Sequence, residues 1–216
     1  KPSLPTAKAL VEKGFNVLMF DFRNSGLSDG SLTTVGALEK DDLLAAIDYV
    51  KNSGFGEKGI GLIGFSMGAS TSLMAAASAP EVNAVIADSP FSDLNTYLRE
   101  NMPYWTHLPD VPFTQMILWE IPMLIGHKPD EVSPLAQADK LQDRPILFIH
   151  GTGDSAINQQ NSKRLMAALD PNRVELWSVA GAHHVGTFEL DPVAYMTRVT
   201  DFFAAHLGQP TTPHAK

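Results

Sequence analysis

The sequence predicts an α/β protein in which a mostly parallel sheet carries helices on both faces. Short apolar runs alternate along the chain with segments whose apolar residues recur at three- and four-residue spacing, as in amphipathic helices. The apolar runs are continuous, which is typical of strands that are covered on both faces. Because 216 residues suffice for one domain with a substantial core, we expect residues 1–216 to form a single domain.

Five strands and five helices follow from this pattern. The strands are expected at residues 16–22, 60–63, 84–87, 145–149 and 174–179, and the helices at residues 6–13, 36–51, 67–78, 159–169 and 192–207. Gly14 stands where the first helix should end, and Gly54 and Gly56 separate the second helix from the strand that follows it. These glycines agree with the alternation of strand and helix.

Residues 92–134 interrupt the alternation. This segment contains no clean strand but is rich in aromatic residues, Met and Pro. Long insertions in compact domains are usually functional, so we expect a helical cap over a site. A pair of additional core helices would account for the same composition.

The composition narrows the classes of function. The 16 Lys and Arg residues against 24 Asp and Glu residues give a net charge of -8, which repels phosphate backbones, so we expect no nucleic-acid partner. No apolar run is long enough to span a bilayer. The absence of Cys removes disulfides, thiolate nucleophiles and Cys-based zinc sites but assigns no compartment. The location and the oligomeric state stay open, with the cytoplasm as the expectation for a soluble domain.

A G-x-S-x-G motif at residues 64–68 stands between a predicted strand and an Ala-rich helix. This context is typical of a nucleophile elbow, a sharp turn that holds a Ser in a strained conformation at the edge of a sheet. We expect Gly64 and Gly68 to make the turn sterically feasible, and Ser66 Oγ to project from the carboxyl edge of the sheet. The backbone N–H of Met67 would then donate to a developing oxyanion. The alternative is that Ser66 only caps a helix.

A second glycine motif, G-x-G-x-x-G at residues 59–64, overlaps the first, and Asp88 follows it where a ribose ligand would stand. A dinucleotide-binding motif needs its glycines after a strand and at the start of a helix. Gly59 and Gly61 instead precede or begin the predicted strand. We therefore reject this interpretation and expect no cofactor.

An activated Ser needs a base to take its proton and a carboxylate to orient that base. Asp154 lies just beyond the predicted strand at 145–149, and His183 and His184 follow the strand at 174–179. Because the carboxyl ends of parallel strands meet at one edge of a sheet, we expect these groups to converge on Ser66. Asp154 on its own would more often be a turn or cap residue.

Only one of the two adjacent histidines can reach the nucleophile, because neighbouring side chains in a loop point in different directions. We select His184 and treat His183 as a core or surface residue. A metal site that uses both is not expected, since no further Asp, Glu or His completes the coordination. His150 precedes a Gly at a strand end and is interpreted as structural, and His107 and His127 fall in the predicted cap.

The chain resembles the α/β-hydrolase family, in its branch of small esterase-like, serine-aminopeptidase-like and monoglyceride-lipase-like proteins. The resemblance covers nearly the whole chain. The residues that carry it are F-D-F-R-N-S-G-L-S at 20–28, G-F-S-M-G at 64–68, D-S-P-F at 88–91, H-G-T-G-D at 150–154, G-A-H-H at 181–184, and Asp191, Pro192 and Tyr195.

The resemblance implies that Ser66 is the nucleophile, Asp154 the acid and His184 the base, and that residues 92–134 form the lid of this branch. The family commonly reads G-A-G-H where this chain has G-A-H-H, so His183 replaces a glycine. In the family, a strand ending in a His-Gly-rich turn precedes the first helix and supplies the second oxyanion donor. This sequence starts after that strand, so the N-terminal strands of the fold and the second donor are absent from it. We therefore expect the natural polypeptide to be longer.

The sequence thus predicts a serine hydrolase that cleaves carboxylic esters through an acyl-enzyme. The apolar content of the predicted cap indicates a small-molecule ester with an apolar acyl group, with Phe91 and Trp119 as substrate-binding residues. An amide- or peptide-cleaving enzyme would use the same triad. A non-catalytic binding protein on the same fold is the third interpretation.

Overall fold

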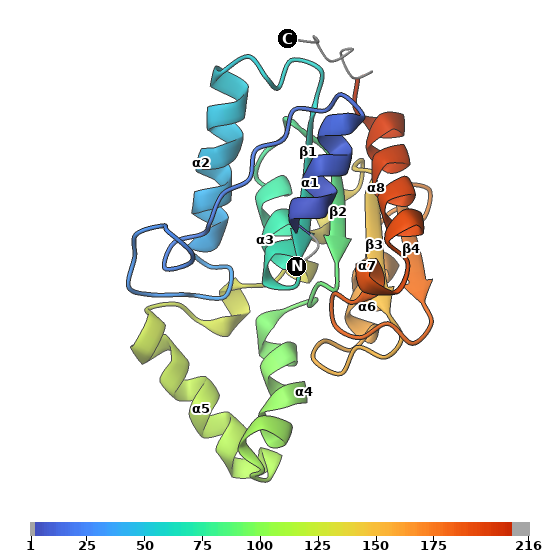
Figure 1. Ribbon diagram of the computed structural model, residues 1–216. Coiled ribbons are helices and arrows are strands. Elements are labelled where there is room, and N and C mark those ends of the chain that lie inside the picture. Colours follow the sequence, from blue (N-terminus) through green and yellow to red (C-terminus); the bar gives the residue numbers. More distant parts are fainter. Residues whose placement is uncertain (1–2, 209–216) are drawn as a thin grey trace.

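The computed structural model describes residues 3–208, except the side chains of Tyr104 and Asp110, and centres on a four-stranded sheet (Figure 1). The strands are β1 (Ile60–Phe65), β2 (Val82–Asp88), β3 (Ile146–Gly151) and β4 (Val174–Val179). They stand in the order β1-β2-β3-β4, and every neighbouring pair is parallel. The carboxyl ends of all four strands therefore lie at one edge of the sheet.

The α-helices lie before, between and after the strands, as the sequence predicts. Their bounds are α1 (Ser3–Glu12), α2 (Glu39–Asn52), α3 (Met67–Ala76), α4 (Leu94–Thr106), α5 (Asp110–Ile125), α6 (Gln160–Ala167), α7 (Thr187–Leu190) and α8 (Pro192–His206). Short 3-10 helices span Pro129–Glu131 and Leu135–Leu141. All five predicted helices are present, as α1, α2, α3, α6 and α8, with their ends shifted by a few residues. The predicted alternation of strands and helices around a parallel sheet is confirmed for these elements.

Helices cover both faces of the sheet. Along β2, Val85 and Ala87 pack into one core with α2, α3 and α6, whereas Ala84 and Ile86 pack into a second core with α1 and α8. All four side chains are fully buried, because successive residues of a strand point to opposite faces. Burial on both faces explains why β2 and β3 are nearly continuous apolar runs in the sequence. On one of the faces, α1 and α8 are in contact with each other (Figure 1).

Aspartates at two helix starts fix where these helices begin. Asp93 precedes α4 and accepts a hydrogen bond from the N–H of Thr96 at 2.7 Å. Asp191 precedes α8 and accepts one from the N–H of Ala194 at 2.9 Å. Each carboxylate satisfies an N–H that has no partner within its own helix. The sequence pattern did not predict α7, which is only four residues long.

The predicted strand at residues 16–22 is wrong. Residues 15–22 form neither helix nor strand in the described chain, and Leu18, Met19 and Phe20 are half-exposed. This segment and β1 line a common cavity of about 590 Å³. An apolar run becomes a strand only where a neighbouring segment takes up its backbone hydrogen bonds. Among the described residues, no strand pairs with residues 15–22, and the cavity lies beside this segment instead.

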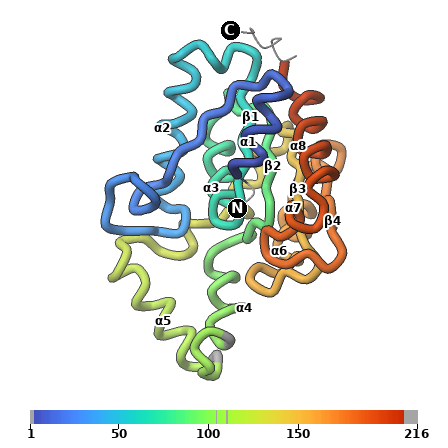
Figure 2. Tube along the Cα trace, viewed as in Figure 1, coloured from blue at the N-terminus to red at the C-terminus, as the bar shows by residue number. Residues whose placement is uncertain are grey.

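Residues 92–134 fold mainly as α4 and α5, which pack against each other beyond the carboxyl ends of the strands (Figures 1 and 2). The base of α4 joins the domain, because Leu94 and Leu98 pack with Met74 of α3. The outer side of α5 exposes Met116, Trp119, Met123 and Leu124. The segment is helical and stands at the edge of the sheet where a cap would be needed. Its role as a lid stays a prediction. In the described part of the chain, no helix combines the length and the apolar character needed to cross a bilayer.

Candidate active site

Ser66 occupies the one-residue turn between β1 and α3. Its backbone has φ 55° and ψ −122°, in a region that side chains other than Gly rarely adopt. The N–H of Ser66 donates to the carbonyl oxygen of Asp88 at 2.8 Å, which ties the turn to the end of β2. The turn therefore presents the Ser66 side chain at the carboxyl edge of the sheet, as expected for a nucleophile elbow.

The two glycines that flank Ser66 have different roles. A Cβ on Gly64 would lie 2.2 Å from the carbonyl oxygen of Gly68, so only Gly fits where the strand passes beneath the first turn of α3. A Cβ on Gly68 would meet nothing nearer than a ring atom of Phe22 at 3.8 Å, an ordinary contact. The expectation that both glycines are sterically necessary is wrong for Gly68.

We expect Gly64→Ala to lower the free energy of unfolding by about 3 kcal/mol or more, because backbone rather than a flexible side chain blocks the new methyl group. Gly68→Ala is the matched control. It should change the free energy of unfolding by less than about 1 kcal/mol, since Ala is favoured over Gly within a helix. Urea unfolding followed by circular dichroism measures both values. Equal losses in the two variants would contradict the steric argument.

His184 lies between Ser66 and Asp154 and contacts both. The hydroxyl of Ser66 lies 2.8 Å from His184 Nε2, and His184 Nδ1 lies 2.8 Å from Asp154 Oδ2. These contacts fit the tautomer in which Nδ1 carries the proton and donates to the carboxylate, which leaves Nε2 free to accept the Ser66 proton. The structure thus brings together the three residues that the sequence singled out, from positions far apart in the chain.

The carboxyl group of Asp154 is fully buried, and every contact to it comes from a donor. Its Oδ1 accepts the N–H groups of Ala156 at 3.0 Å and Ile157 at 2.8 Å. On the other side, Oδ2 lies 3.4 Å from His150 Nε2 in addition to its bond with His184. Burial alone would raise the pKa of Asp154, but the hydrogen bonds from His150, His184 and Ile157 outweigh it and hold the pKa well below its usual range. Asp154 is therefore a carboxylate at neutral pH.

His150 is structural in the sense that it is fully buried and fixed at both nitrogens. Its Nδ1 lies 2.7 Å from Ser162 Oγ, and its Nε2 lies 2.8 Å from the carbonyl oxygen of Ile157. The ring thereby anchors the loop that carries Asp154. The sequence pattern placed His150 at a strand end but gave no sign that it faces the same carboxylate as His184.

The loops that carry Asp154 and His184 are interlocked. A Cβ on Gly151 would lie 2.1 Å from the carbonyl oxygen of Ala182, so the two backbones approach as closely as only Gly allows. The N–H of Gly153 donates to the same oxygen at 3.0 Å, and the N–H of Gly181 donates to Thr152 Oγ1 at 2.9 Å. The glycines of the H-G-T-G-D motif therefore fix the distance between the acid and the base.

His183 contacts Glu189 rather than Ser66. Its ring is largely exposed, and its Nε2 lies 3.2 Å from Glu189 Oε2. His107 and His127 lie at the ends of α4 and α5, where His127 Nδ1 lies 3.0 Å from Glu131 Oε2. Within residues 3–208, no group of three or more metal-ligating side chains is gathered at one place.

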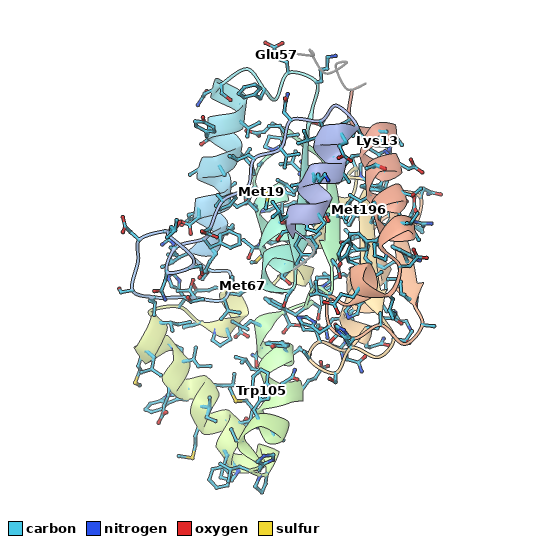
Figure 3. All side chains as sticks on the ribbon, viewed as in Figure 1. Lys13, Met19, Glu57, Met67, Trp105 and Met196 are labelled. Carbon is cyan, nitrogen blue, oxygen red and sulfur yellow. The ribbon has the colours of Figure 1, made fainter. Side chains whose placement is uncertain are left out.

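Met67 is the first residue of α3, so its backbone N–H has no acceptor within the helix. Figure 3 shows Met67 at the end of the sheet that faces α4, with Trp105 farther out on that helix. An N–H in this place, at the positive end of a helix dipole, is suited to stabilise an oxyanion on a carbonyl attacked by Ser66. Its use as an oxyanion donor stays a prediction, and so does the absence of a second donor from this sequence.

Phe91 and Trp119 lie in very different surroundings. Phe91 is 1% exposed and stacks on Tyr97 with ring centroids 5.5 Å apart, so it forms part of the core beneath α4. Trp119 is 68% exposed on α5. Because Tyr97 covers Phe91, Phe91 can support a substrate surface only from below. Both substrate-binding assignments remain predictions.

Three site-forming residues were not assigned a role from the sequence. Ser89 and Thr152 supply hydroxyl groups that bind the His184 loop, and Val185 continues that loop in a left-handed conformation with φ 53°. Their positions were the available signal, because Ser89 directly follows β2 and Thr152 directly follows β3, at the same edge of the sheet as Ser66. Short polar residues after buried strands are candidates for holding neighbouring loops in place.

The parallel sheet, the strand-to-helix turn at Ser66 and the chain order Ser, Asp, His together define an α/β-hydrolase. More narrowly, residues 3–210 match the model of the prolyl oligopeptidase family, and the chain belongs to that family. It is also similar to the esterase Pf2001 of Pyrococcus furiosus, with 30% identity and a TM-score of 0.73, over 95% of this chain and 76% of that one.

Two curated relatives carry no assigned function. The uncharacterized protein YqkD of Bacillus subtilis is 34% identical over 165 residues, which are 76% of this chain and 54% of the relative. The uncharacterized protein YfhR of Escherichia coli strain K12 is 28% identical over 208 residues, which are 94% of this chain and 65% of the relative. The chain thus spans between about half and two thirds of the length of these relatives.

Proposed function

We propose that this protein is a serine hydrolase that cleaves carboxylic esters through an acyl-enzyme intermediate. The observation that supports this most directly is the continuous hydrogen-bonded relay from Ser66 through His184 to Asp154, with both contacts at 2.8 Å. The strained conformation of Ser66 is a second support, because such strain persists where a side chain must be presented at a fixed place.

The relay suggests a role for each group. Ser66 Oγ attacks the carbonyl carbon of the ester while His184 Nε2 takes the hydroxyl proton, and Asp154 stabilises the resulting imidazolium. The N–H of Met67 donates to the oxyanion of the tetrahedral intermediate. When the intermediate collapses, His184 returns the proton to the departing alkoxide. A water molecule, deprotonated by the same His, then hydrolyses the acyl-enzyme and regenerates Ser66.

Amide cleavage is a second candidate, favoured by the membership of this chain in the prolyl oligopeptidase family. The same three groups would act. An amine leaves only after it is protonated, so proton transfer from His184 to the leaving group contributes more to the activation free energy than it does for an ester. The likeness to a protein named as an esterase favours esters. The acyl group is proposed to be apolar, because the helices beyond the site expose Trp, Met and Leu side chains.

A fluorophosphonate probe and a matched pair of substrates test the proposal. We expect the probe to label folded protein at Ser66, as mapped by mass spectrometry, and to label neither heat-unfolded protein nor His184→Ala. The p-nitrophenyl ester of a short acyl group should show a larger kcat/KM than the p-nitroanilide of the same acyl group. A preference for the anilide would select amide cleavage. Well-folded protein that is neither labelled nor active would identify a non-catalytic binding protein.

A further inference from the structure

The turn that carries His184 is under backbone strain at its next residue. Val185 has φ 53°, and β-branched residues rarely adopt this left-handed conformation. Such a conformation persists only where the surroundings hold it in place. Because Val185 is bonded directly to His184, whatever holds Val185 also sets the direction of the imidazole.

A hydrogen bond ties Val185 to Ser89. The N–H of Val185 donates to Ser89 Oγ at 3.3 Å, and Ser89 itself is 1% exposed. Ser89 directly follows β2, and its own backbone is left-handed, with φ 54°. Its N–H donates to the carbonyl oxygen of Ile149 in β3 at 2.9 Å. The backbone of Ser89 is thus fixed to two strands of the sheet, and its hydroxyl contacts the loop that follows β4.

A buried carboxyl group orients the Ser89 hydroxyl. Ser89 Oγ donates to Asp88 Oδ1 at 3.1 Å, and the phenol of Tyr195 on α8 donates to Asp88 Oδ2 at 2.9 Å. Burial raises the pKa of Asp88 to about 6, against the opposing effect of these two donors. Above that pH, the carboxylate accepts the hydrogen bond from the Ser89 hydroxyl, which leaves a lone pair of Oγ for the N–H of Val185. A series of hydrogen bonds therefore connects Tyr195 on α8, through Asp88 and Ser89, to the residue that follows His184.

We propose that Ser89 is a positioning residue for His184, which it holds through Val185 so that the imidazole stays between Ser66 and Asp154. This inference rests on the proposed function. Ser89 does not touch the substrate in this role, which goes beyond its contact with the His184 loop described above. Its hydroxyl limits the rotation of the His184 loop, which carries the imidazole that contacts both Ser66 and Asp154.

The test compares two buried hydroxyl groups three residues apart. Ser89→Ala removes the contact with Val185. Ser92→Ala, the matched control, removes a buried hydroxyl that bonds instead to Asn161 at 2.9 Å, away from the His184 loop. At pH 8, where Asp88 is ionised, Ser89→Ala should lower kcat about tenfold with KM within twofold of wild type, because a small displacement of a catalytic group costs rate rather than binding. Ser92→Ala should lose similar stability and keep wild-type kcat.

A third variant separates position from stability. Ser89→Gly also removes the hydroxyl, but Gly adopts φ 54° without strain, so this variant should be more stable than Ser89→Ala. If Ser89 acts through position, both variants lose kcat by the same factor despite their different stabilities. A kcat that instead follows the free energy of unfolding across the Ser89 and Ser92 variants would overturn the proposal, and so would wild-type kcat in Ser89→Ala.

A proton NMR measurement keeps this inference separate from the proposed function. The proton that His184 Nδ1 shares with Asp154 should resonate far downfield of the amide region. We expect this resonance to shift and broaden in Ser89→Ala and to stay unchanged in Ser92→Ala, whether or not the protein turns over any ester. An unchanged resonance in Ser89→Ala would refute the positioning role. Absence of turnover in wild type would refute only the proposed function.

Discussion

Ser66→Ala is expected to lower the turnover of a p-nitrophenyl ester by about 10⁵- to 10⁶-fold, the loss typical of removing the nucleophile of a working triad. The Ser66 hydroxyl is the partner of His184 Nε2, so its removal leaves this base without the hydroxyl that it would deprotonate. Ala has the same Cβ and the same unfavourable φ as Ser at this turn. The fold should therefore be retained, with a free energy of unfolding within about 1 kcal/mol of wild type.

Ser70→Ala is the matched control for Ser66→Ala. Ser70 lies one turn into α3 and is fully buried, and its hydroxyl bonds to the backbone of Phe91 rather than to His184. This variant should keep kcat near wild type while losing about 1 kcal/mol of stability. Turnover that survives in Ser66→Ala would show that another residue is acylated, and the assignment of the nucleophile would be withdrawn.

Asp154→Asn is expected to lower kcat by about 10⁴-fold while the structure stays intact. The amide oxygen of Asn can still accept the N–H groups of Ala156 and Ile157, which keeps the loop closed. Its amide nitrogen would then stand where Oδ2 now meets His184 Nδ1 at 2.8 Å. Two donors cannot share that contact, so the imidazole would adopt the other tautomer and present an N–H to Ser66 instead of a lone pair.

Asp191→Asn provides a matched change from carboxylate to amide. Asp191 caps α8 through the N–H of Ala194, and Asn caps helices as well as Asp does, so kcat should stay at the wild-type value. The rates are best measured by rapid mixing with a p-nitrophenyl ester, which reports acylation as a burst and deacylation as the steady state. A loss below about tenfold in Asp154→Asn would mean that His184 keeps its tautomer without the carboxylate.

Sequence patterns predicted most of this fold because the relevant interactions are local or periodic. The inner strands β2 and β3 are recognised as apolar runs because both of their faces are buried, and Asp191 marks the start of α8 through its own side chain. The run at 16–22 shows the limit of this reasoning. It has the composition of a strand, but whether it pairs depends on a neighbour, which composition does not specify.

The sequence also predicted which residues form the candidate site, but not how the loops that carry them pack. Ser66, Asp154 and His184 each follow a predicted strand, and the geometry of a parallel sheet brings such positions together. What the sequence did not indicate is the packing between loops, such as the contact of Gly151 with Ala182 or the hydrogen bond from Val185 to Ser89. These contacts depend on distances between backbones, and small polar or glycine residues in loops serve many other purposes as well.

The relay spans the sheet, with Ser66 after β1, Asp154 after β3 and His184 after β4. A slip of one residue in any strand pairing would displace a loop by about 3.3 Å, which exceeds the whole length of either hydrogen bond in the relay. If the proposed function holds, the rate of hydrolysis is expected to report the alignment of the strands. Preparations with native helix content but misaligned strands would be indistinguishable by far-ultraviolet circular dichroism and yet inert toward substrate.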